Sequence, residues 1–183
     1  MKRRVVVTGM AGLSPIGNDW ASVRRALLAS ESGIEAQSDW EGIRGLQTRL
    51  GGAVKNFSMP AEYPRQKTRG MGRVAQLSTR ATELALRDAR LFDHPALHDG
   101  STGISYGSGA GSPPAFGVYA RHVMQERTVK GISPNDFIQL MSHTVAANLG
   151  QFFEIRGRVI PTCSACTSGS QGVGYGFETI QNG

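Results

Sequence analysis

The sequence predicts an α/β protein with a mainly parallel, mixed sheet covered by helices. Short runs rich in β-branched residues alternate with longer segments whose apolar residues recur at helical spacing. Glycine or proline follows several of these runs and marks the loops between them. Strands that alternate with helices in this way are typical of parallel sheets with covered faces.

The composition of the 183-residue chain is that of a globular protein. With 39% hydrophobic and 19% charged residues, it is not an intrinsically disordered segment. Its 24 glycines have no three-residue period, and two cysteines are too few to staple a fold of this size. No stretch approaches the roughly 18 consecutive apolar residues of a membrane span. We expect one globular domain, located in the cytoplasm with reduced thiols.

The first part of the chain is expected to form one strand and one helix. Arg4 to Thr8 is a continuous β-branched run that leads into a glycine-rich loop. Asn18 or Asp19 is suited to cap a helix that ends by Gly33. The apolar residues at helical spacing in this segment are Trp20, Val23, Leu27 and Leu28.

A second helix is predicted over residues 74–89, after a long loop region. Glycine and proline are dense over residues 38–64, so we expect at most a short strand near 50–54 there. The predicted apolar stripe of the helix, which should pack on a sheet, comprises Val74, Leu77, Ala81, Leu84, Ala85 and Ala89.

The second half of the chain repeats the alternation of strands and helices. Strands are predicted at 104–106 and 158–160, and a final helix at 167–181. Between the strands, one helix is predicted from its cap Ser133, with Phe137, Met141, Val145 and Leu149 on one face.

A glycine-rich segment after the strand at 104–106 resembles a dinucleotide-binding loop only in part. Gly107-Ser108-Gly109-Ala110-Gly111 would need a third fingerprint glycine where Ser112 stands. Two prolines follow where the helix should receive the pyrophosphate. We interpret the segment as a turn at which two stretches of backbone approach closely.

The same region also fits the letters of a hydrolase nucleophile elbow. Ser105 stands in a G-x-S-x-G pattern, and Asp136 and His143 follow in the order of that triad. The elbow needs its serine on a sharp turn into a helix, whereas Ser105 lies within the predicted strand. We therefore interpret His143 as a hydrogen-bonded structural residue. The remaining histidines complete no Cys/His spacing for a metal site.

The net charge of +6 favours an acidic partner or substrate. A solvated basic face is the alternative interpretation, and no aromatic-basic interleaving or helix-turn-helix pattern indicates nucleic acid. The basic residues form two clusters: Arg65, Lys67, Arg69 and Arg73, and then Arg121, Arg127 and Lys130.

Cys163-Ser164-Ala165-Cys166 is the most informative segment. It lies where a predicted strand gives way to a predicted helix. Free backbone N–H groups and the helix dipole stabilise the thiolate of a cysteine at a helix N-terminus, which indicates covalent catalysis. The C-x-x-C spacing also permits thiol–disulfide exchange, and a pair of buried structural cysteines is a third interpretation.

From Arg3 to its end the sequence resembles the type I/II β-ketoacyl-acyl carrier protein synthases, which have the thiolase fold. The segments that carry the resemblance are Arg3 to Gly9, Leu13 to Gly17, Ser32 to Ile34, Gly107 to Gly111, Ile132 to Pro134 and Arg156-Gly157, in family order. Ser164 to Gly169 matches the nucleophile signature of the family, which is specific.

The resemblance assigns roles to individual residues. Cys166 is implied to be the acyl-accepting nucleophile, and its own N–H to be one half of an oxyanion hole. Cys163 stands where the family has a small residue, which weakens the redox interpretation. Ala110 and Phe137 are implied to line the acyl pocket, where the family often has a larger aliphatic residue in place of Ala110.

The implied reaction is a decarboxylative Claisen condensation of an acyl thioester with malonyl carrier protein. It would serve fatty-acid synthesis or a polyketide or aryl polyene pathway. It needs no metal and no bound cofactor, because the substrates are carried on the phosphopantetheine of an acyl carrier protein. The resemblance further implies a homodimer, in which the strand from Arg158 to Pro161 is the central interface, or a heterodimer with a chain-length factor.

Family members are more than twice as long as this chain. We therefore expect residues 1–183 to be the N-terminal half of a ketosynthase. The family's two decarboxylating histidines, a supporting lysine and the glycine-rich segment with the second oxyanion donor would follow this half, so we expect the chain alone to be inactive. Two alternatives remain: a thiol–disulfide protein that uses Cys163 and Cys166, and a non-catalytic partner subunit, against which the presence of Cys166 argues.

Overall fold

The computed structural model describes residues 2–183, and the chain divides into two compact units. Unit 1 comprises the chain up to Met10 together with Met59–Gly183, and unit 2 comprises Ala11–Ser58. The residues predicted to be functional all lie in unit 1. Within residues 2–183, no helix is both long enough and apolar enough to cross a membrane.

The centre of unit 1 is a parallel pair of strands, β3 (Ile104–Gly107) and β4 (Val159–Thr162). Their register sets Ile104 opposite Val159 and Gly107 opposite Thr162. Both strands lie where the β-branched runs predict them, and the helical connection between them is what a parallel pair requires.

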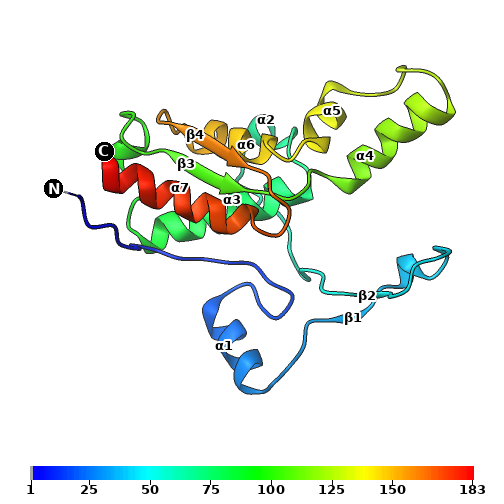
Figure 1. Cartoon of the computed structure of the whole chain (residues 1–183), viewed down its shortest axis with the longest axis horizontal. Helices are drawn as coiled ribbons and strands as arrows, with labels where there is room; N and C mark the ends of the chain where they lie inside the picture. The colour runs from blue at the N-terminus through cyan, green and yellow to red at the C-terminus, as the bar shows by residue number, and fades with distance from the viewer. Residues whose placement is uncertain (1) are drawn as a thin grey trace. The chain divides into compact units, whose positions relative to one another are not determined.

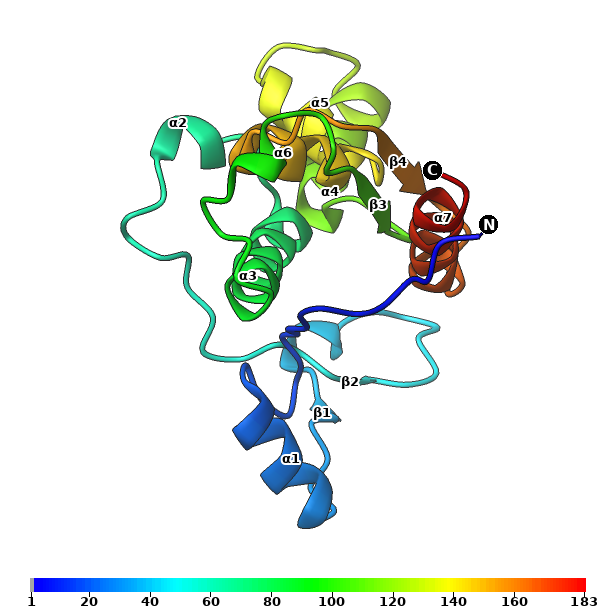
Figure 2. The ribbon, with the colours of Figure 1, turned by 90° about the vertical axis from the view of Figure 1, so that its left-hand side faces the viewer.

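Helices cover both faces of this pair, as Figures 1 and 2 show. α7 (Ser168–Asn182) lies against one face, and α6 (Thr144–Phe153) contacts both strands from the other. α7 approaches closely because Gly107 lies under its first turn: a Cβ there would stand 2.0 Å from the carbonyl oxygen of Ser168. This packing fixes the start of α7 relative to the ends of the two strands.

α3 (Arg73–Asp88) confirms the predicted second helix, but the face that it buries differs from the predicted stripe. Its buried residues are Ala75, Thr79 and Glu83, and it packs mainly against α6. The small side chains of Ala75 and Thr79 allow this close packing, and Met71 and Val145 complete the core there.

The predicted helix from Ser133 to Leu149 is wrong as a single element. The chain forms α5 (Pro134–Leu140) and then α6, with Met141 in an extended conformation between them. The carbonyl of Gln139, which would accept the next helical bond, instead accepts from the N–H of Ser112 at 2.8 Å. Ser133 caps α5 as predicted and forms a capping box with Asp136.

A further helix, α4 (Pro113–Ala120), is absent from the sequence prediction. Its two initial prolines suit the first turn of a helix, where the missing N–H costs nothing. α4 continues into a π-helical turn, Arg121–Gln125, and the short helices α2 (Arg65–Thr68) and Pro95–Leu97 complete unit 1.

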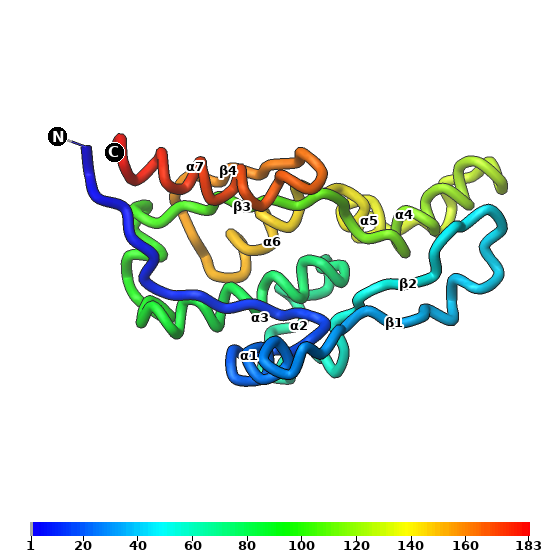
Figure 3. The backbone as a smooth tube through the Cα atoms, turned by 60° about the horizontal axis from the view of Figure 1, so that its bottom comes forward, coloured from blue at the N-terminus to red at the C-terminus, as the bar shows by residue number. Residues whose placement is uncertain are grey.

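The predicted strand from Arg4 to Thr8 is also wrong. The segment is irregular, and the N–H of Arg3 donates to the carbonyl of Gln181 at 3.2 Å. Figure 3 shows this segment beside the end of α7. A strand requires a neighbour for its ladder of hydrogen bonds, and within residues 2–183 no strand pairs with this run, so Val7 remains 76% exposed.

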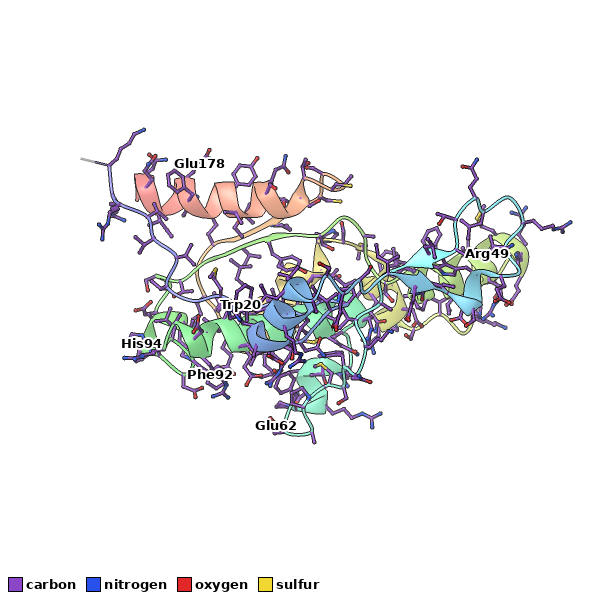
Figure 4. All side chains as sticks on the ribbon, turned by 90° about the horizontal axis from the view of Figure 1, so that it is seen from below. Trp20, Arg49, Glu62, Phe92, His94 and Glu178 are labelled. Atoms are coloured by element: carbon purple, nitrogen blue, oxygen red, sulfur yellow. The ribbon has the colours of Figure 1, made fainter. Side chains whose placement is uncertain are left out.

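Unit 2 contains α1 (Trp20–Leu28) and a short antiparallel pair, β1 (Glu35–Ala36) with β2 (Leu50–Gly51). Asp19 caps α1 by accepting from the N–H of Ser22 at 2.8 Å, as predicted. The apolar face predicted for this helix is largely exposed, and Trp20, labelled in Figure 4, is 71% exposed. A turn of 3₁₀ helix, Ser38–Trp40, follows β1.

Candidate active site

The two cysteines lie in the connection that joins β4 to α7. Both thiols are free and exposed. Thr162, the last residue of β4, is buried and its hydroxyl donates to the carbonyl of Ser168 at 2.7 Å, so its side chain faces α7. Cys163 is exposed and comes directly after β4, whereas Cys166 is exposed in the turn that precedes α7. The two thiols thus occupy different positions in the same connection: Cys163 lies before the turn and Cys166 lies within it.

The backbone reverses direction directly before Cys166. Ala165 has a φ of 50°, in the left-handed region that residues other than glycine seldom adopt. The N–H of Thr167 donates to the carbonyl of Ser164 at 3.1 Å, and the N–H of Ser168 to that of Ala165 at 3.2 Å. Cys166 is therefore presented at the tip of a tight turn, ahead of a 15-residue helix.

Hydroxyl groups brace this turn from within. The Ser168 Oγ donates to the carbonyl of Ala165 at 2.7 Å and accepts from the N–H of Ser164 at 2.8 Å. The Thr167 Oγ1 donates to the carbonyl of Ser164 at 2.7 Å, and the Ser164 Oγ donates to Gln171. The sequence prediction missed this bracing; its only signal was the set of small hydroxyl residues at the start of the helix.

The glycine-rich segment after β3 lies beside the turn. The N–H of Ser108 donates to the carbonyl of Thr162 at 3.1 Å, and a Cβ on Gly109 would stand 3.4 Å from the carbonyl oxygen of Ala165. The Ser108 Oγ donates to the carbonyl of Ala110 at 2.8 Å. The predicted close approach of backbone is confirmed, and it sets Gly109, the residue before Ala110, beside Ala165, the residue before Cys166.

Phe137 lies on α5, which contacts the other end of the glycine-rich segment. It is 48% exposed and packs at 6.1 Å between ring centroids against Tyr119 of α4. α5 meets the glycine-rich segment at Gly111, where a Cβ would stand 2.1 Å from the carbonyl oxygen of Leu140. The assignment of Ala110 and Phe137 to an acyl pocket stays a prediction.

The geometry argues against the hydrolase triad. Ser105 lies within β3, and its hydroxyl is buried with no hydrogen-bond partner in residues 2–183. The hydroxyl and N–H of Ser133 both donate to Asp136 and hold the pKa of that carboxyl below its usual range. The prediction of a hydrogen-bonded His143 is wrong: it stands at the start of α6, and its ring forms no hydrogen bond within the described chain.

Among residues 2–183, no group of three or more His, Cys, Asp or Glu side chains is arranged to hold a metal ion. A cavity of about 330 Å³ lies far along α7 from the thiols. The side chains that line it include Arg158 and Ile160 of β4 and Tyr175 and Glu178 of α7. It is therefore separate from the turn that carries Cys166.

The first basic cluster is held to the scaffold by its central lysine. The Lys67 ammonium donates to the carbonyl of Phe152 at 3.1 Å and to Glu154 at 2.7 Å. Arg65 and Arg69, on either side of Lys67, are exposed. In the second cluster, Arg121 pairs with Glu126 at 3.5 Å, and Arg127 and Lys130 are exposed.

A buried carboxylate anchors the segment that precedes α2. Glu83 is 3% exposed and accepts from Arg80 at 2.6 Å, from Arg87 at 2.8 Å, and from the hydroxyl of Tyr63. The Tyr63 ring packs at 4.7 Å on Phe152 of α6. Burial, together with the hydrogen bond to Glu83, raises the pKa of Tyr63, so its hydroxyl remains a donor. We call this group the Glu83 cluster.

The family described as "Beta-ketoacyl synthase, N-terminal domain" matches residues 2–183. A "3-oxoacyl-[acyl-carrier-protein] synthase 1" from Haemophilus influenzae is 32% identical over 99% of this chain and 44% of its own length. A "3-oxoacyl-[acyl-carrier-protein] synthase 2" from Vibrio cholerae is 31% identical over 100% of this chain and 43% of its own length. The chain thus spans less than half the length of these relatives.

Solved structures agree with this result. A β-ketoacyl synthase from Burkholderia phymatum superposes with a TM-score of 0.93 at 39% identity, over 100% of this chain and 44% of its own. The ishigamide ketosynthase/chain length factor superposes with a TM-score of 0.83 at 22% identity, over 100% of this chain and 45% of its own, which is a likeness of fold. The predicted fold class, the N-terminal half of a thiolase-like fold, is confirmed.

Proposed function

The chain belongs to the β-ketoacyl synthase family, and on that premise we propose that Cys166 is the acyl-accepting nucleophile of a 3-oxoacyl-[acyl-carrier-protein] synthase. One observation carries the proposal. Cys166 is an exposed thiol that follows the left-handed Ala165 and stands one residue before Thr167, the N-cap of the long helix α7, without itself being part of that helix. A helix N-terminus presents free backbone N–H groups and the positive end of its dipole to an anion that forms beside it.

The proposed reaction has two stages. The Cys166 sulfur attacks the carbonyl of an acyl thioester, and the phosphopantetheine thiol of the carrier leaves. The backbone N–H of Cys166 donates to the oxyanion that forms. Malonyl carrier protein then loses carbon dioxide, and its carbanion attacks the acyl-cysteine, which releases 3-oxoacyl carrier protein and regenerates the thiol. We propose this activity for the whole protein and not for residues 1–183 alone. The Haemophilus influenzae relative is more than twice as long as this chain.

An acidic acyl carrier protein is the proposed partner. Arg65 and Arg69 are exposed on a segment that Lys67 fixes to α6, and Arg127 and Lys130 form a second exposed pair. Such charges accelerate the association of an acidic protein and orient it. One structure of similar fold is described as an acyl-carrier protein in complex with its ketosynthase.

The outer edge of β4 is the proposed interface with a second subunit. Within residues 2–183, β4 pairs only with β3, so its other edge has no strand partner. Val159 and Pro161 of this strand are exposed. An unpaired edge is a template for a strand of another chain. A second copy or a chain-length factor would fill it, and we propose the cytoplasm as the compartment because the thiol must stay reduced.

Acylation of single-cysteine variants tests the nucleophile. The wild-type chain, Cys166→Ala and Cys163→Ala are incubated with radiolabelled acyl-pantetheine, and the bound label is counted after denaturation. We expect Cys166→Ala to lose all covalent label, because the bond-forming sulfur is gone, and Cys163→Ala to retain it. Label that persists in Cys166→Ala would contradict the proposal.

A further inference from the structure

The hydroxyl of Ser168 lies buried behind the turn that carries Cys166. Ser168 is 2% exposed, whereas Cys166 and Thr167 are exposed. Because solvent does not reach the Ser168 hydroxyl, water cannot replace the bonds that it forms. Its two partners are the backbone groups of Ser164 and Ala165, the residues that reverse the chain before Cys166.

These two bonds tie the first half of the turn to the start of α7. The Ser168 Oγ accepts from the N–H of Ser164 at 2.8 Å, where the turn begins, and donates to the carbonyl of Ala165 at 2.7 Å, one residue before Cys166. The carbonyl of Ser168 itself accepts from the Thr162 hydroxyl at 2.7 Å. One side chain thus ties the end of β4, the turn and the start of α7 together.

Ala165 needs such support because its conformation is unfavourable. With a φ of 50° and a side chain, it is in a region that an alanine leaves unless its surroundings hold it. Cys166 is the next residue, so any relaxation of Ala165 moves the thiol relative to the first turn of α7. The dipole and the free N–H groups of a helix act only on groups that lie close to its first turn.

We infer that Ser168 is a positioning residue, which aims the Cys166 thiol by holding Ala165 in its left-handed conformation. The inference rests on the proposed function, since it takes Cys166 as the nucleophile. Ser168 touches no reacting atom, and it acts through the backbone of Ser164 and Ala165. Thr162 supports it from β4.

The alkylation rates of the two thiols in one molecule test this role. The chain is treated with iodoacetamide, and the fractions modified at Cys166 and at Cys163 are followed by peptide mass spectrometry. We expect Ser168→Ala to slow Cys166 about tenfold, since a small displacement of a reacting group lowers its rate by one to two orders of magnitude. Cys163, which follows β4 and precedes the turn, should keep its rate.

Three further variants complete the test. Ser170→Ala removes the same atom from an exposed serine in the same helical turn and should leave both rates unchanged. Ser168→Thr retains the hydroxyl and should restore most of the Cys166 rate. Thr162→Val removes only the bond to the Ser168 carbonyl, and we expect it to slow Cys166 two- to threefold. It provides the decisive measurement if circular dichroism shows that Ser168→Ala does not fold.

Two outcomes would overturn the inference. One is a wild-type Cys166 rate in the folded Ser168→Ala and Thr162→Val variants. The other is an equal slowing of Cys163, which would mean a general disturbance of the chain. Neither outcome depends on the thioester experiment, so a failure of the positioning role is distinguishable from a failure of Cys166 to accept an acyl group.

Discussion

The Glu83 cluster and the turn that carries Cys166 are stabilised by different kinds of interaction. The first joins charged groups around a buried carboxylate, with ion pairs to Arg80 and Arg87. The second contains no charged side chain from Thr162 to Gln171 and relies on hydroxyl and backbone bonds. We therefore expect separate groups of residues to set the free energy of unfolding and the reactivity of the Cys166 thiol. A substitution in one group should change one of these quantities without the other.

Removal of the Glu83 carboxylate should give the largest loss of stability. Glu83→Ala leaves Arg80, Arg87 and Tyr63 without their common acceptor. We expect the free energy of unfolding to fall by about 3 kcal/mol, at the low end for a broken buried pair because both arginines remain partly exposed. Urea unfolding measures this.

Glu178→Ala is the matched control, because Glu178 is exposed on α7 (Figure 4). It should change the free energy of unfolding by less than about 0.5 kcal/mol. The Cys166 alkylation rate of the folded Glu83→Ala variant should equal that of the wild type. A slowed thiol would show that the two regions are coupled after all.

Gly107→Ala should lower both the stability of the chain and the reactivity of Cys166. A Cβ at Gly107 would lie 2.0 Å from the carbonyl oxygen of Ser168, so α7 must shift from β3. We expect a loss of about 2 kcal/mol from this overpacking, together with slower alkylation of Cys166 and not of Cys163. Thermal unfolding and peptide mass spectrometry measure the two.

Gly117→Ala in α4, where a Cβ meets nothing within 4 Å, serves as the control for Gly107→Ala. It should stabilise the chain by up to about 1 kcal/mol, because alanine is the better helix former. If both variants behaved alike, the contact between Gly107 and Ser168 would not be what positions α7.

Acidification should produce the smallest effect. Burial alone would raise the pKa of Glu83, but the hydrogen bonds from Tyr63, Arg87 and Arg80 outweigh it and hold that pKa below its usual value. A depressed pKa stabilises the folded state above the unfolded value of about 4.3, and this stabilisation is lost as the pH falls through the folded value.

We therefore expect the difference in unfolding free energy between wild type and Glu83→Gln to be constant at neutral pH and to shrink below about pH 4.3. Urea unfolding of both proteins at a series of pH values measures it. Because other carboxylates also titrate there, only the difference between the two proteins reports on Glu83. A difference that is independent of pH would contradict the role given to the carboxylate.

The sequence predicts those parts of the fold that depend on neighbouring residues. β4, α7 and the capping of α1 by Asp19 follow from local patterns, and all three are confirmed. The run from Arg4 to Thr8 has the same β-branched character as β4 but forms no strand, because pairing depends on a distant partner. The break between α5 and α6 depends on a bond from Ser112, more than twenty residues earlier in the chain.

The candidate site also contains both features that local sequence predicts and features that depend on tertiary structure. Cys166 is identifiable from its place at the start of a helix, which is a local signal. The supporting role of Ser168 depends on the left-handed conformation of Ala165, which no propensity indicates for an alanine. The burial of Glu83 depends on how α3 packs against α6, and the apolar stripe predicted for that helix gives no sign of it.

The distribution of an acyl label between the two thiols of the wild-type chain shows which cysteine is the nucleophile. The unsubstituted protein is incubated with an acyl thioester under reducing conditions, and its peptides are analysed by mass spectrometry. We expect one acyl group per chain, on Cys166, because only that thiol stands at the tip of the turn before α7. An acyl group on Cys163, or equal labelling of both cysteines, would contradict it.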